Sequence, residues 1–250
     1  MMCENGGKIV VANWKMFGDF EFTIHYLKHL CDCMLDPNLR VIVCPPVPYI
    51  NLAQRIITEH ENEQICIGAQ CVSASENVSS TGEISAKMLE ECGAKIVMVG
   101  HSERRKIDET DEVVNRKLAV LEGSLLGAIL CVGEDEDVKS KGQDAVCEFI
   151  KKQLDAALKG IKIDESIMIA YEPIWAIGSG KTPTEEEISV VANTIKEHVG
   201  DNVRVLYGGS INENNINQMI NCGATDGILI GRFSTKTHEF CSALEGLHLR

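Results

Sequence analysis

Short apolar runs divide this chain at nearly regular intervals. Runs of four to eight apolar residues are typical of strands that are buried on both faces, as in a parallel sheet. The eight runs are Ile9–Ala12, Val41–Cys44, Ile65–Ala69, Ile96–Val99, Leu126–Val132, Ile167–Tyr171, Val203–Tyr207 and Gly227–Ile230.

Amphipathic stretches with helical spacing separate these runs. They are Phe20–Met34, Asn51–His60, Glu83–Cys92, Val113–Leu121, Ala145–Leu158, Glu185–Val199, Asn214–Cys222 and His238–Leu247. Eight strand–helix units in 250 residues predict an α/β fold, a single-domain (β/α)8 TIM barrel over residues 1–250. A doubly wound sheet is the alternative, but no G-x-G-x-x-G motif follows the first run.

The segment from Tyr171 to Thr182 combines a carboxylate with a glycine-rich loop. Glu172 directly follows the sixth run, and Pro173 prevents a simple continuation of that strand. The following loop is suited to open and close as a lid. Thr184 and Glu187 then fit a capping box that starts a helix. We interpret Glu172 as a general base with its own lid.

The same loop has a second interpretation. Its sequence Gly178-Ser179-Gly180-Lys181-Thr182 is similar to the end of a phosphate-binding P-loop. That motif needs a glycine five positions before its last glycine, where this chain has Trp175. An ordinary glycine-rich surface turn is a further alternative for this segment considered alone.

Polar and glycine residues follow the other runs as well. In chain order these segments are Asn13-Trp14-Lys15, His101–Arg105, Gly208-Gly209-Ser210 and Gly231-Arg232. The carboxyl ends of the strands form one face of a barrel, and that face holds barrel active sites. Each residue alone could be an ordinary loop side chain, but together they predict an active site.

Charge and cysteine content exclude several classes of function. The formal net charge of −13 disfavours nonspecific binding to nucleic acid or anionic membranes. We find no apolar run of about 20 residues and no secretory pattern near Met1, so we expect an intracellular protein. The eleven cysteines have no zinc-ligand spacing, so we expect reduced structural thiols.

Four segments together resemble the signature of the triosephosphate isomerase family. They are Ala12–Met16, Gly100–Arg105, Tyr171–Gly178 and Tyr207–Ser210, in the family's order and spacing. The resemblance implies an aldose–ketose isomerase that moves a proton through an enediolate, with no metal and no organic cofactor. It also implies a place in glycolysis and gluconeogenesis and a cytoplasmic location.

The resemblance also implies roles for individual residues. Glu172 is the expected base and His101 the expected neutral electrophile; the family is itself the usual example of a histidine kept neutral by a helix N-terminus. Lys15 and Asn13 are expected to stabilise and position the oxyanion. Glu103 is expected to be a partner of Lys15 or of a neighbouring loop.

The phosphate of a small phosphorylated sugar is expected at a second group of residues. By resemblance its donors come from Asn13, Lys15, Gly178, Ser210, Gly231 and Arg232. The segment around Thr81 resembles a loop that reaches the partner subunit, which implies a homodimer. Cys131 is expected to pack near the base, and Glu134 to form a salt bridge.

One departure from the family pattern affects the phosphate site. The family has two glycines after the eighth strand, where this chain has Gly231 and Arg232. Arg232 could lean over the phosphate or turn outward to a surface carboxylate. An isomerase acting on a four-carbon ketose phosphate, and a non-catalytic phosphosugar-binding barrel, are therefore kept as alternatives.

Overall fold

The strands close into a barrel because the first pairs with the last. The computed structural model describes residues 7–76 and 79–249. In it β1 (Lys8–Asn13) pairs in parallel with both β2 (Leu39–Cys44) and β8 (Gly227–Ile230). The remaining strands follow in chain order around the ring: β3 (Ile65–Ala69), β4 (Ile96–Val99), β5 (Gly127–Val132), β6 (Ile167–Tyr171) and β7 (Arg204–Gly208). The predicted (β/α)8 barrel is confirmed.

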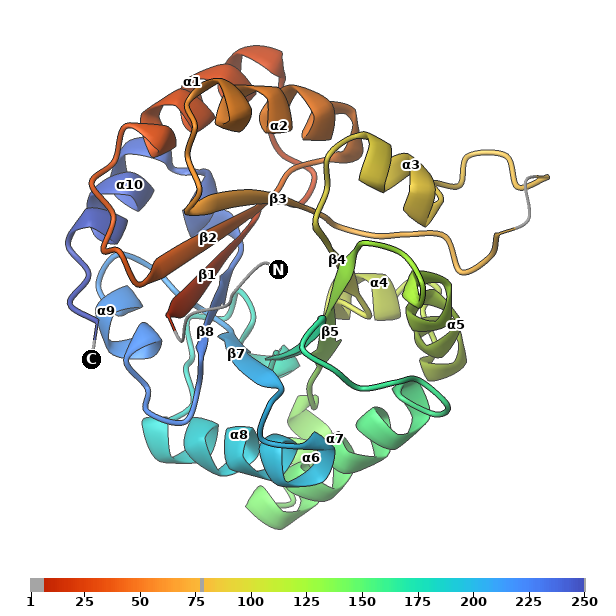
Figure 1. Ribbon diagram of the computed structural model, residues 1–250. Coiled ribbons are helices and arrows are strands. Elements are labelled where there is room, and N and C mark those ends of the chain that lie inside the picture. The colour runs from red at the N-terminus through yellow and green to blue at the C-terminus, as the bar shows by residue number, and fades with distance from the viewer. Residues whose placement is uncertain (1–6, 77–78, 250) are drawn as a thin grey trace.

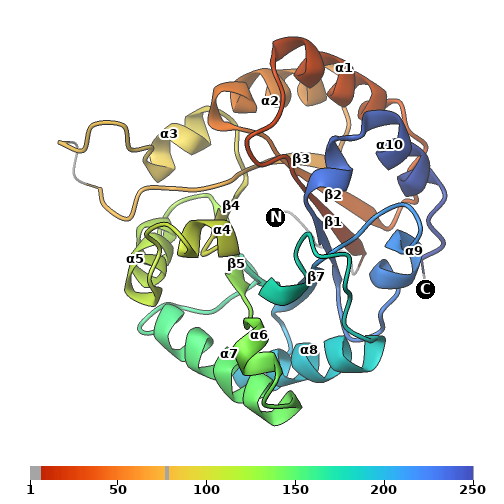
Figure 2. The ribbon, with the colours of Figure 1, turned by 180° about the vertical axis from the view of Figure 1, so that it is seen from behind.

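Helices form a ring outside the strands, and Figures 1 and 2 look along the barrel from its two ends. The longer helices are α1 (Phe20–Cys31), α2 (Ile50–Glu59), α5 (Asp111–Leu121), α7 (Gln143–Ala157), α8 (Glu185–Val199) and α10 (Thr237–Glu245). The shorter ones are α3 (Ala86–Glu91), α4 (Ser102–Arg105), α6 (Glu136–Lys139) and α9 (Ile216–Ile220), with 3-10 turns η1 (Val47–Tyr49), η2 (Ile174–Ala176) and η3 (Arg232–Thr235). None of the helices within the described ranges is long and apolar enough to cross a bilayer.

Successive side chains of each strand point alternately into the barrel and toward the helices, so the protein has two separate cores. Ile9 and Val11 point into the barrel and pack with residues such as Ile129. Val10 and Ala12, between them, point outward and pack against the helices. Because successive side chains of a strand lie on opposite faces, a continuous apolar run fills both cores.

Several predicted helices are shorter in the structure; the one expected over Asn214–Cys222, for example, is α9 with only five residues. The helix expected over Glu83–Cys92 begins at Ala86, because the Ser85 side chain accepts a hydrogen bond from the Met88 N–H and caps it. The helix expected over Phe20–Met34 ends at Cys31, and a turn follows it. The predicted capping box of Thr184 and Glu187 is confirmed at the start of α8.

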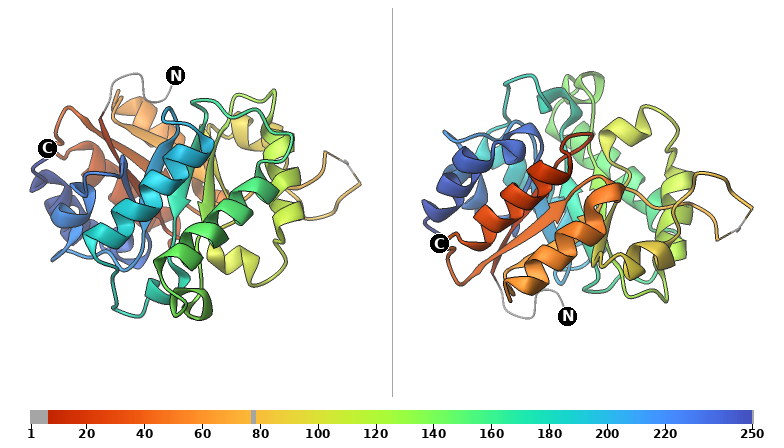
Figure 3. Two further views of the ribbon diagram at one scale, coloured as in Figure 1. Left: turned by 90° about the horizontal axis from the view of Figure 1, so that it is seen from below. Right: turned by 90° about the horizontal axis from the view of Figure 1, so that it is seen from above.

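The segment between β3 and α3 extends away from the ring of helices (Figures 1 and 3). It contains Thr81, which is exposed. Within the described ranges, ten cysteines have free thiols, and Cys3 lies outside those ranges.

Candidate active site

Glu172 is held in a close-packed position where β6 ends. Its side chain is only 3% exposed, and its backbone N–H donates to the Val132 carbonyl at 2.7 Å. A Cβ at Gly133 would lie 1.8 Å from the Glu172 carbonyl oxygen, and one at Gly208 would lie 3.0 Å from Glu172 Cγ. Burial and then the Glu172 charge raise the pKa of the Cys131 thiol, which hydrogen-bonds this carboxylate. Two glycines and a protonated thiol therefore fix the carboxylate.

His101 lies directly beside that carboxylate. Its Nε2 is 3.3 Å from Glu172 Oε1, and the ring is the N-cap of α4. The Glu103 backbone N–H donates to His101 Nδ1 at 3.2 Å. An imidazolium carries protons on both nitrogens and could not accept this bond, so the geometry favours a neutral ring with its proton on Nε2. That proton is directed toward the Glu172 carboxylate.

Lys15 adopts a backbone conformation that its neighbours maintain. Its φ of 54° is in the left-handed region, which is unfavourable for a lysine. Its N–H donates to Asn13 Oδ1 at 3.0 Å, and its carbonyl accepts from Gln70 Nε2 at 2.8 Å. The ammonium then pairs with Glu103 Oε1 at 2.6 Å, as the sequence predicted.

Gly231 places the turn after β8 against Lys15. A Cβ there would lie 3.2 Å from Lys15 Cε, so a larger residue would push the lysine side chain aside by a few tenths of an ångström. Arg232 starts η3, and the first N–H groups of a helix have no partner inside it. Arg232 is exposed, has no positive φ, and forms no ion pair with any carboxylate of the described residues. The outward salt bridge considered for Arg232 is therefore not observed.

The loop after η2 stands free at its tip and is anchored where it begins, in η2. Gly178 has a φ of 68°, and a Cβ there would meet no atom within 4 Å. At one end Trp175 Nε1 donates to Glu134 Oε1 at 2.7 Å. Across the rim, Ser210 Oγ donates to the Ala176 carbonyl at 2.5 Å. The anchors leave the tip free to move, which suits a lid.

Glu134 differs from its prediction. A salt bridge was expected, but within the described part of the chain the side chain accepts hydrogen bonds from Trp175 and Tyr171. Glu134 is fully buried, and this burial raises its pKa. Two aromatic donors take the place of the expected cation, and the ammonium of Lys139 pairs with Glu187.

The sequence did not identify a buried ion cluster that supports the His101 segment. Glu109 is 2% exposed and accepts from the Gly100 N–H at 3.1 Å, from Arg104 Nε at 2.9 Å and from Lys117 Nζ at 2.5 Å. Burial alone would raise the pKa of Glu109, but the bonds from Lys117 and Arg104 outweigh it and lower that pKa. The cluster fixes the end of β4, one residue before His101.

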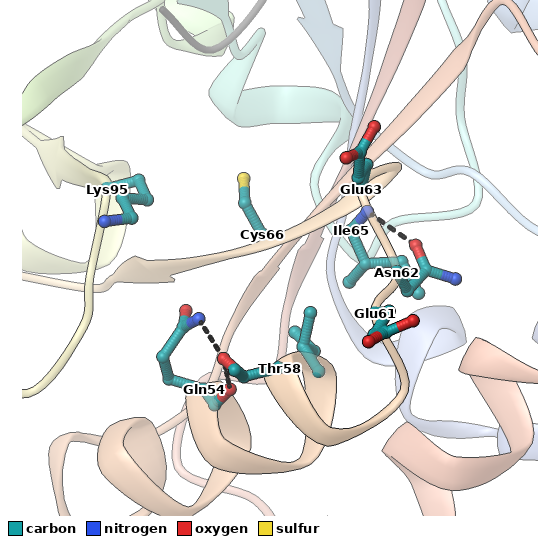
Figure 4. Close-up of a pocket in the computed structure, with 9 residues that line it drawn as sticks. Gln54, Thr58, Glu61, Asn62, Glu63, Ile65, Cys66 and Lys95 are labelled. Carbon is teal, nitrogen blue, oxygen red and sulfur yellow. Dashed lines mark hydrogen bonds between the residues drawn. The ribbon is translucent and has the colours of Figure 1, made fainter.

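Other hollows in the molecule lie away from these side chains. One of about 540 Å³ is bordered by Gln54, Asn62 and Lys95 and opens beside α2, where β3 and β4 begin (Figure 4). It lies at the opposite end of the strands from Glu172. Among the described residues no group of three or more His, Cys, Asp or Glu is placed to hold a metal ion.

Comparison with known proteins identifies a family whose members have similar sequences. The sequence model of the family described as triosephosphate isomerase matches residues 8–247. A protein named triosephosphate isomerase from Clostridium tetani is 40% identical over 245 residues, which cover 93% of each chain. One of the same name from Hahella chejuensis is 36% identical over 246 residues, 95% of this chain and 97% of that protein.

Proposed function

The chain belongs to the triosephosphate isomerase family and isomerises triose phosphates, and on this premise we propose a role for each residue of the site. The substrate is a phosphorylated sugar, and the reaction interconverts glyceraldehyde 3-phosphate and dihydroxyacetone phosphate, a step of glycolysis. The observation that supports the proposal most directly is the 3.3 Å contact between Glu172 Oε1 and His101 Nε2.

Glu172 is the base that moves the proton between the two carbons. A substrate that binds between a carboxylate and a histidine N–H is contacted on both sides. Its carbon faces the base, Glu172, and its oxygen faces the donor, His101. The isomerisation needs the proton to leave one carbon and return to its neighbour. A base fixed by close-packed glycines serves both carbons with little motion of its own.

His101 and Lys15 stabilise the negative charge that develops on the substrate oxygens. His101 donates from Nε2, because Nδ1 is occupied by the Glu103 N–H. Lys15 supplies a positive charge, and Asn13 holds its backbone. Glu103 pairs with the same ammonium at 2.6 Å and sets its position.

The phosphate binds where the ends of β7 and β8 meet the lid. Its donors are the N–H groups of Gly178, Ser210, Gly231 and Arg232, in turns that leave them unused within the adjoining elements. Lid closure brings Gly178 to the phosphate and excludes water, which protects the enediolate from losing phosphate by elimination.

The protein acts as a homodimer, with the Thr81 segment reaching the partner subunit's Asn13 and Glu103. Support comes from the exposed apolar side chains near the site: Met16 is 99%, Phe17 51% and Phe20 60% exposed. An apolar group of this kind next to a projecting loop is typical of a contact surface.

The residues 1–250 form one domain, and the free thiols fit a cytoplasmic location.

The assay of function compares two substrates and one variant. Wild type should convert glyceraldehyde 3-phosphate with at least tenfold higher kcat/KM than a tetrulose phosphate, and Glu172→Gln should abolish conversion without unfolding. A tenfold preference for the tetrulose phosphate would contradict the triose assignment, and an inactive wild type would support a binding barrel.

The dimer is tested separately by light scattering. Met16→Asp introduces a charge into the proposed contact and should yield monomers with reduced activity. Met34→Asp is the matched control, because Met34 is also 86% exposed but lies after α1. A dimer that persists in Met16→Asp would contradict the proposed contact surface.

A further inference from the structure

The barrel has one seam where no loop of the chain joins neighbouring units. Everywhere else around the ring, adjacent strands follow one another in sequence. At the seam β1 pairs with β8, and α1 packs against α10 (Figures 1 and 3). The two ends of the chain are therefore held together there by noncovalent contacts of the described residues.

Two cysteine side chains meet across this seam. Cys33 lies in the turn after α1 and packs against the core that contains Cys241 of α10, and the two thiols interact directly. The Cys33 thiol also donates to the His29 carbonyl at 3.2 Å. The next residue in the turn, Met34, donates its N–H to Glu245 Oε1 at 3.0 Å. Cys241 and Glu245 are four residues apart and share one face of α10. Two successive turn residues are thus fixed on the same face of one helix.

The two cysteines differ in reactivity: Cys33 is suited to be the attacking thiol and Cys241 the resolving thiol. The hydrogen bond from Cys241 lowers the pKa of Cys33, whereas the same bond and burial raise the pKa of Cys241. Cys33 is half-buried and Cys241 is buried. Two residues from Cys33, burial and the nearby Asp32 charge raise the pKa of Cys31 to about 11. Because the thiolate is the reactive form, we expect Cys33 to react ahead of Cys31.

We propose that Cys33 and Cys241 are a redox site that forms a reversible disulfide across the barrel seam when the protein meets a hydroperoxide. The Cys33 thiolate attacks the terminal oxygen of the hydroperoxide; the S–O bond forms, the O–O bond breaks, and an alkoxide leaves, or hydroxide when the oxidant is hydrogen peroxide. The Cys241 sulfur then attacks the sulfur of the resulting sulfenic acid. The S–S bond forms, and the sulfenic hydroxyl leaves as water with the Cys241 proton. The peroxide is reduced, both sulfurs are oxidised, and a thiol reductant reverses the change.

The disulfide stabilises the barrel rather than changing its chemistry. It closes a loop of roughly 200 residues, and long closed loops restrict the unfolded chain most. Cys33 precedes β2, at the end of the barrel where strands begin, so the rim that holds Glu172 is at the opposite end. Oxidation should raise Tm by about 5–10 °C and leave kcat unchanged.

The experiment maps cross-linked peptides in the full-length protein. Reduced wild type is treated with hydrogen peroxide, free thiols are alkylated, and the digest is analysed by mass spectrometry. We expect one peptide pair joined through Cys33 and Cys241, reversed by dithiothreitol. The pair and the rise in Tm should disappear in Cys33→Ser and persist in the matched control Cys31→Ser.

A second variant tests the order of the two steps. In Cys241→Ala, which keeps a small apolar side chain in α10, Cys33 should accumulate as a sulfenic acid that dimedone traps. Three results would overturn the proposal: no reaction at Cys33, oxidation of Cys33 without the cross-link to Cys241, or a Tm rise that persists in Cys33→Ser.

Discussion

The replacement of Arg232 by glutamine tests how this chain binds phosphate with an arginine where its family has glycine. Arg232→Gln keeps the backbone N–H and removes only the positive charge. Two unit charges about 5 Å apart interact by roughly 3 kcal/mol at an effective dielectric constant of 20 and by under about 1 kcal/mol in bulk water. Because Arg232 is exposed, the bulk-water energy is the better approximation for its interaction with each negative charge of the phosphate.

A dianionic phosphate therefore gains about 1.5 kcal/mol from Arg232, which corresponds to roughly a tenfold change in affinity. The phosphate carries the same charge in the ground state and in the transition state, so the interaction is uniform binding. Arg232→Gln should raise KM about tenfold at low ionic strength and change kcat little.

Salt separates this electrostatic effect from a steric one. The screening length is about 10 Å in 0.1 M salt and 3 Å in 1 M salt, so the KM difference should shrink as salt rises. Arg232→Lys is the matched control because it retains the charge and should keep most of the affinity. Initial rates with glyceraldehyde 3-phosphate at both salt concentrations provide the measurement. Equal KM values for wild type and Arg232→Gln at low salt would refute the reasoning.

Three further substitutions test the base and its support. Glu172→Asp withdraws the carboxylate by about 1 Å and should lower kcat on the order of 100-fold with Tm unchanged; a near wild-type kcat would exclude Glu172 as the base. Gly208→Ala places a Cβ 3.0 Å from Glu172 Cγ and should lower kcat while circular dichroism shows an intact fold. Glu109→Gln leaves Lys117 buried without its carboxylate and should cost about 3–5 kcal/mol in urea unfolding at pH 7. The pKa of Glu109 is lowered in the folded state, so its contribution is present above the unfolded pKa near 4.5 and is lost as pH falls below that value. Stability should thus depend less on pH in this acidic range in Glu109→Gln than in wild type.

The strands were predictable because burial on both faces leaves a continuous apolar run. All eight runs became strands. Their ends moved by one or two residues where pairing extends past the apolar runs, as at Lys8 in β1 and Leu39 in β2. The helix α6 was missed because its four residues are too few to show a helical period. The local signals of a helix start were its capping residue Asp135 and the acidic first turn of Glu136 and Asp137.

The candidate site was predictable where a residue type was unusual for its place, as at Glu172 after a buried strand. The supporting residues lacked that signal. Gln70 binds the Lys15 carbonyl from the end of β3, 55 positions away in sequence, and a glutamine after a strand is unremarkable alone. Glu109 and Lys117 looked like ordinary surface charges of a helical region until the fold buried both. Such pairs depend on long-range contacts that a local pattern does not encode.

The contacts divide the site into two parts. The rigid end contains Glu172, His101 and Lys15, and the mobile phosphate end contains Gly178 and Arg232. Glu172, His101 and Lys15 are each fixed by at least two neighbours, and glycines at 133, 208 and 231 allow those neighbours to approach closely. Among the described residues, a Cβ at Gly178 would meet no atom within 4 Å, and the Arg232 side chain forms no ion pair. The proposed base and electrophile are therefore preorganised before substrate enters, and binding energy at the proposed phosphate site can be used to close the lid. It follows that variants of the rigid end should change kcat, whereas the Arg232 charge should act on KM, and the two kinds of effect should be additive because the altered groups share no contact.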